Sequence, residues 1–139
     1  VVLGAESAQI VAIDGSRTAA RIAAQDFASG LALLEPEQSL GPGLAARRSS
    51  DAEVGAEIVI VASTGDADRR VSDGWVTAIE PFDANWEYSL EHAISTSAQS
   101  PGYGGAPICD RSGGVLGLSF LDAGEVGRFT LGIPLDDAL

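Results

Sequence analysis

Covalent catalysis by a side chain needs a hydroxyl or thiol within reach of a general base, most often an imidazole. The 139-residue chain contains one histidine, His92, and one cysteine, Cys109. A catalytic pair of Cys109 and His92 is therefore chemically possible. However, Cys109 follows Pro107 and Ile108 in an apolar run, which is typical of a small buried core residue. We expect Cys109 to be structural.

Metal binding is the second chemistry to weigh. One imidazole rarely holds a metal alone. Glu91, Asp83 and Glu87 lie near His92 in the sequence, but adjacent strand residues point to opposite faces. The remaining acidic residues lack the spacing of a calcium loop and indicate a solvated face: Asp51, Glu53, Asp66, Asp68 and Asp73. The sequence predicts no metal and no cofactor, and a metal site in a remodelled cleft is a weaker alternative.

The charge balance limits the classes of partner. The formal net charge is −12, from 20 acidic and 8 basic residues. Such a chain repels phosphate backbones, so we expect no nucleic-acid partner. Apolar runs are too short to span a membrane, and the first ten residues lack the basic start of a signal peptide. A single cysteine excludes an intrachain disulfide.

Short apolar runs separated by turn residues predict an all-β fold. The expected strands are 8–13, 31–34, 57–62, 71–80, 88–95, 106–109, 115–120 and 128–133. Residues 18–24 fit a strand or a short helix, and Asp14-Gly15 favours a hairpin between 8–13 and this segment. We expect Pro36 to end the apolar run 31–34. Trp75 should lie in the core or between barrels. Residues 135–139 should start a helix.

Residues 39–53 are rich in glycine, serine and arginine, which predicts a linker. We therefore divide the chain into a first part, residues 1–50, and a second part, residues 51–139.

Four stretches, taken in order, resemble the HtrA (DegP-type) family of trypsin-like serine proteases, over nearly the whole chain. They are 25–34 (QDFASGLALL), 71–78 (VSDGWVTA), 100–108 (SPGYGGAPI), and 113–118 with 131–134 (GGVLGL and LGIP). The third stretch is similar to the family's nucleophile loop, N-P-G-N-S-G-G-P-L. The resemblance implies a trypsin-like double β-barrel, with the second barrel complete and the first barrel missing its opening strands.

The triad positions depart from the family pattern. Gly104 stands where the resemblance places the nucleophilic serine, and Gly30 stands where it places the aspartate. The family histidine precedes a Val-Val pair, so if Val1-Val2 match it, the histidine position lies one place before Val1. Glycine offers neither a nucleophile nor a carboxylate that orients a base. The resemblance therefore implies a degenerate site and a pseudoprotease.

Two features of the family site remain open. Backbone N–H groups of Gly102, Tyr103 and Gly104 are a candidate oxyanion-type nest, and the alternative is a plain glycine-rich turn. A serine-type hydrolase with a displaced nucleophile, at Ser97 or Ser100, is the alternative function. Both serines precede the turn instead of lying inside it.

Partner binding is the expected function. Because barrels avoid open sheet edges, we expect a protein partner or a missing N-terminal segment to complete the first barrel, in a protein-binding or scaffolding subunit. Phe82, Trp86 and Tyr88 form an aromatic-acidic segment that is either a binding surface or folded onto the barrel. By resemblance, the location is extracytoplasmic, as in the periplasm.

Overall fold

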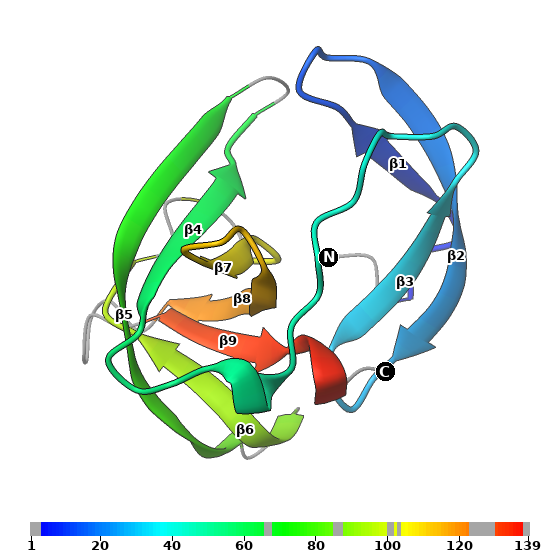
Figure 1. Ribbon diagram of the computed structural model, residues 1–139. Helices are drawn as coiled ribbons and strands as arrows, with labels where there is room; N and C mark the ends of the chain where they lie inside the picture. Colours follow the sequence, from blue (N-terminus) through cyan, green and yellow to red (C-terminus); the bar gives the residue numbers. More distant parts are fainter. Residues whose placement is uncertain are drawn as a thin grey trace.

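The computed structural model describes residues 4–65, 68–84, 88–99, 102, 104–122 and 130–137. Within these residues the chain forms a three-stranded antiparallel sheet and a closed barrel of six antiparallel strands. Figure 1 shows the sheet and the barrel facing each other, with the linker running between them. The all-β expectation is confirmed, with one closed barrel and an open sheet in place of a closed first barrel. The division at residue 50 stays a prediction.

The open sheet consists of β1 (Ala8–Val11), β2 (Arg17–Asp26) and β3 (Leu31–Pro36), with β2 in the middle. Residues 18–24 are therefore strand and not helix. The expected turn at Asp14-Gly15 is present, since Asp14 Oδ1 accepts the Ser16 N–H at 2.9 Å and Gly15 has a φ of 81°. β3 continues two residues beyond Leu34, and Pro36 is its last residue.

The linker is tied to the barrel at two points. The Arg47 N–H donates to the Val115 carbonyl at 2.8 Å, and the Val115 N–H donates to the Ala45 carbonyl at 2.8 Å. A short 3₁₀ turn, η1 (Ser49–Asp51), follows. There the Ser49 N–H and Oγ donate to the two carboxylate oxygens of Asp136, at 2.8 and 2.9 Å. Residue Asp136 lies in a second 3₁₀ turn, η2 (Leu135–Asp137), where a helix start was expected.

The barrel closes in the strand order β4-β5-β6-β9-β8-β7. Its strands are β4 (Glu57–Ser63), β5 (Arg69–Ala84), β6 (Tyr88–Thr96), β7 (Pro107–Asp110), β8 (Val115–Asp122) and β9 (Thr130–Pro134). Each of the expected strand segments in this half falls on one of them.

The barrel interior is filled by β-branched and small side chains. On β4, Ile58, Ile60 and Ala62 are at most 1% exposed, while Glu57, Val59 and Val61 alternate with them outward. Ile94 and Ile108 are fully buried, and the backbone of β9 leaves no room for a side chain at Gly117. A Cβ at Gly117 would meet the Ile133 carbonyl oxygen at 2.6 Å, so only glycine fits there.

The expectation that Trp75 lies in the core is wrong for the barrel interior. Trp75 is 52% exposed, because Gly74 and Val76 point inward and Trp75 lies between them on β5. It faces outward opposite Glu57 of β4. Among the described residues, no helix is long and apolar enough to cross a membrane.

Candidate functional site

The loop between β6 and β7 carries the position of the expected nucleophile. β8 holds it in place: the Gly105 N–H donates to the Ser119 carbonyl at 2.6 Å, and the Ala106 N–H donates to Ser119 Oγ at 3.1 Å. Gly105 is the left-handed residue, with a φ of 92°. A Cβ built at Gly104 would lie 3.4 Å from the Phe120 carbonyl oxygen, so a small side chain fits there with little adjustment.

Gly104 and Gly105 line an open cavity of about 740 Å³ on the outer side of β4 and β7. Its floor is apolar and includes Val59, Val61 and Cys109. The cavity combines an apolar wall with backbone of the glycine turn, an arrangement typical of a binding cleft. Of the candidate nest, Gly102 and Gly104 are described. Gly102 lies against Ala62 and Thr64, and Tyr103 lies outside the described residues.

The position of the expected aspartate lies in the turn between β2 and β3. Gly30 closes this turn with a φ of 75°, and its N–H donates to the Asp26 carbonyl at 2.9 Å. The Asp26 carboxylate braces the same turn, since Oδ2 accepts the Ser29 hydroxyl at 2.6 Å and Oδ1 accepts the Ala28 N–H at 3.0 Å. These two hydrogen bonds hold the pKa of Asp26 below its ordinary value. The nearest carboxylate along the chain is therefore already engaged within the turn.

His92 and Cys109 line different cavities. Cys109 is 8% exposed and lies on the floor of the 740 Å³ cavity, where burial, and then the neighbouring Asp110 charge, raises the pKa of its thiol. A thiol with a raised pKa is a poor nucleophile. His92 lines a cavity of about 530 Å³ with Glu91, Ser49 and Asp136. The expectation that Cys109 is a buried structural residue agrees with this placement.

The Asp136 carboxylate is the acidic group beside His92. Partial burial acts to raise its pKa, but the two hydrogen bonds from Ser49, together with the His92 charge, leave the pKa of Asp136 below its ordinary value. Asp136 therefore remains an anion that fixes the linker. Within the described part of the chain, no three His, Cys, Asp or Glu residues lie close enough together to hold a metal ion.

Of the two serine alternatives, the structure describes Ser97. Ser97 Oγ accepts the Trp75 N–H at 2.9 Å, so this hydroxyl is bound to the backbone of β5. Ser100 lies outside the described residues, as does Trp86 of the aromatic segment. Of the other aromatic residues, the Phe82 side chain is half-buried and packs against a buried cluster formed by Leu90, Ala93, Leu131 and Ile133. Tyr88 begins β6, and its side chain is outside the described set.

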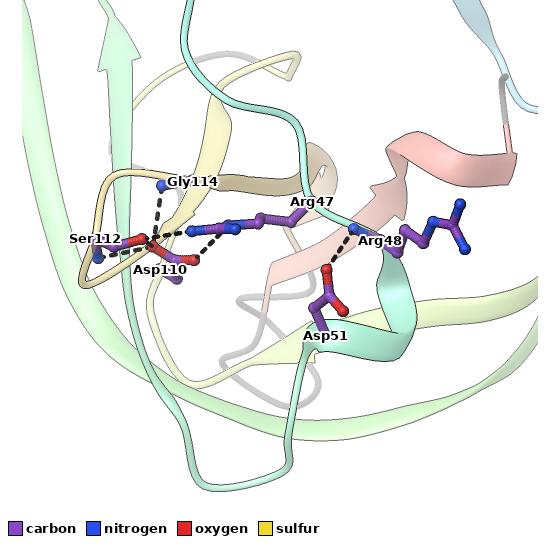
Figure 2. Close-up of polar contacts among 6 residues, drawn as sticks. All are labelled: Arg47, Arg48, Asp51, Asp110, Ser112 and Gly114. Atoms are coloured by element: carbon purple, nitrogen blue, oxygen red, sulfur yellow. Dashed lines mark hydrogen bonds and ion pairs between the residues drawn. The ribbon is translucent and has the colours of Figure 1, made fainter.

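A polar cluster that the sequence did not predict joins the linker to the β7–β8 turn (Figure 2). Asp110 Oδ1 accepts the Ser112 N–H at 2.7 Å, the Ser112 hydroxyl at 2.6 Å and the Gly114 N–H at 3.0 Å. Arg47 donates from Nε to Asp110 Oδ2 at 3.2 Å and from one terminal nitrogen to Ser112 Oγ at 3.0 Å. Asp110 and Arg111 also line the 740 Å³ cavity, so the cluster fixes one end of its wall.

The family of trypsin-like peptidase domains matches residues 1–118. The chain belongs to this trypsin-like family. No curated protein sequence matches the chain significantly.

Solved structures with the same fold include two of an HtrA-type protease. They are "HtrA-type protease AlgW with decapeptide" and "HtrA-type protease AlgWS227A with decapeptide", with TM-scores of 0.82 and 0.83, each at 23% sequence identity. In both cases the similarity covers 99% of this chain and 43% of the AlgW chain. The chain therefore spans less than half the length of these trypsin-like relatives. The predicted HtrA-type, trypsin-like fold is confirmed.

Proposed function

We propose that this trypsin-like domain is catalytically inactive and binds protein, as a scaffolding subunit of a larger assembly. The observation that carries the proposal is the glycine at position 104, in the loop where the HtrA resemblance places the nucleophile. Gly30 stands at the aspartate position of the same resemblance. Without a hydroxyl or a carboxylate at these places, neither an acyl-enzyme nor an oriented imidazole can form there.

Among the described residues, the nearest carboxylate and the histidine have other surroundings. Asp26 uses both carboxylate oxygens to brace its own turn. The chain's single histidine, His92, lines the 530 Å³ cavity with Asp136, whereas Gly104 lines the 740 Å³ cavity. Nucleophile, base and orienting carboxylate must be hydrogen-bonded in sequence to act. This separation supports a loss of catalysis.

Polypeptide binding is the activity that the remaining features favour. Both AlgW structures are described with a decapeptide, and the present chain has the same fold. Its 740 Å³ cavity has an apolar floor beside Gly104 and Gly105, and Gly104 is a candidate for part of a residual anion-binding nest. We extend the proposal to a protein partner or a further chain segment that completes the first barrel, and to an extracytoplasmic location as in HtrA-type proteases.

An unfolded protein substrate tests the inactive state. The domain is incubated with casein for a day, and fragments are followed by mass spectrometry, with trypsin as positive control. We expect no fragment above the casein blank, from the natural chain and from a Gly104→Ala variant alike. Fragments that disappear in Ser97→Ala, Ser100→Ala or Cys109→Ala would establish the displaced-nucleophile hydrolase instead. Fragments that disappear on adding a chelator would favour the metal-dependent alternative.

A further inference from the structure

We draw no further inference here: the strongest candidate, the exposed apolar patch that Val71 and Trp75 form on the outer face of β5, carries none because nothing in the structure shows what covers it.

Discussion

Asp110 and Arg47 are joined by an ion pair across 63 positions of the chain, with Arg47 Nε at 3.2 Å from Asp110 Oδ2. Arg47 belongs to the linker, and Asp110 ends β7. The same carboxylate accepts the N–H groups of Ser112 and Gly114. One side chain therefore holds a barrel turn and fixes the linker to it.

Removal of this carboxylate should destabilise the fold. We expect Asp110→Ala to lower the free energy of unfolding by about 1–2 kcal/mol, because two backbone N–H groups lose their acceptor. Arg47→Ala should cost at most about 1 kcal/mol, since the ion pair itself is partly solvated. Urea denaturation measures both.

Arg111 provides the matched control. It pairs with Glu57 at 2.9 Å, but the two side chains are 77% and 50% exposed. We expect Arg111→Ala to change the free energy of unfolding by less than about 0.5 kcal/mol. A loss as large as that of Asp110→Ala would contradict the role given to the Asp110 cluster.

The same carboxylate gives a pH dependence. The Ser112 hydroxyl, and then the Gly114 N–H, hold the pKa of Asp110 below its ordinary value of 3.8. A lowered folded-state pKa adds stability that is complete above the unfolded value and is lost as the pH falls through the folded value. We therefore expect the stability difference between the natural chain and Asp110→Asn to be constant from pH 7 to 5. It should shrink below about pH 4.

Denaturant midpoints measured from pH 7 to 2.5 provide this comparison. Asp73→Asn, on the outer face of β5, controls for the removal of one negative charge from a chain of net charge −12. A difference for Asp110→Asn that grows on acidification would contradict the assignment.

Gly30 should resist substitution because of its backbone. With a φ of 75°, an alanine there is strained by about 1–2 kcal/mol. Gly43 is a matched control, since its backbone is not left-handed and nothing lies within 4 Å of a Cβ built on it. Thermal unfolding should show a lower melting temperature for Gly30→Ala and no decrease for Gly43→Ala. Equal effects would mean that the turn tolerates a side chain at position 30.

The sequence predicted the strands well because their signals are local. The alternation of Ile58, Ile60 and Ala62 with outward residues marks β4 without any knowledge of its neighbours. Around Trp75 the pattern is ambiguous, because the inward neighbours Gly74 and Val76 are no more apolar than Trp75 itself, and its exposure follows only from the folded barrel. By contrast, the pairs Arg47–Asp110 and Ser49–Asp136 join residues far apart in the chain. No local pattern reports such contacts.

The candidate site was predictable only in part. The similarity of the segment around Gly104 to a nucleophile loop selects a turn that the structure places beside the 740 Å³ cavity. The engagement of Asp26 in its own turn, and the placement of His92 and Cys109 in different cavities, depend on how the sheet and the barrel are arranged. These facts come from tertiary structure alone.

The most direct test of the central claim is labelling with a fluorophosphonate probe, read by intact mass. The natural chain and Gly104→Ser are compared, because the serine fits at this position and returns the hydroxyl, while Gly30 still provides no carboxylate. We predict no adduct on either protein under conditions that label trypsin fully. An adduct on the natural chain would contradict the inactive assignment. An adduct on Gly104→Ser alone would show that a base lies in reach of position 104, contrary to the degenerate site proposed here.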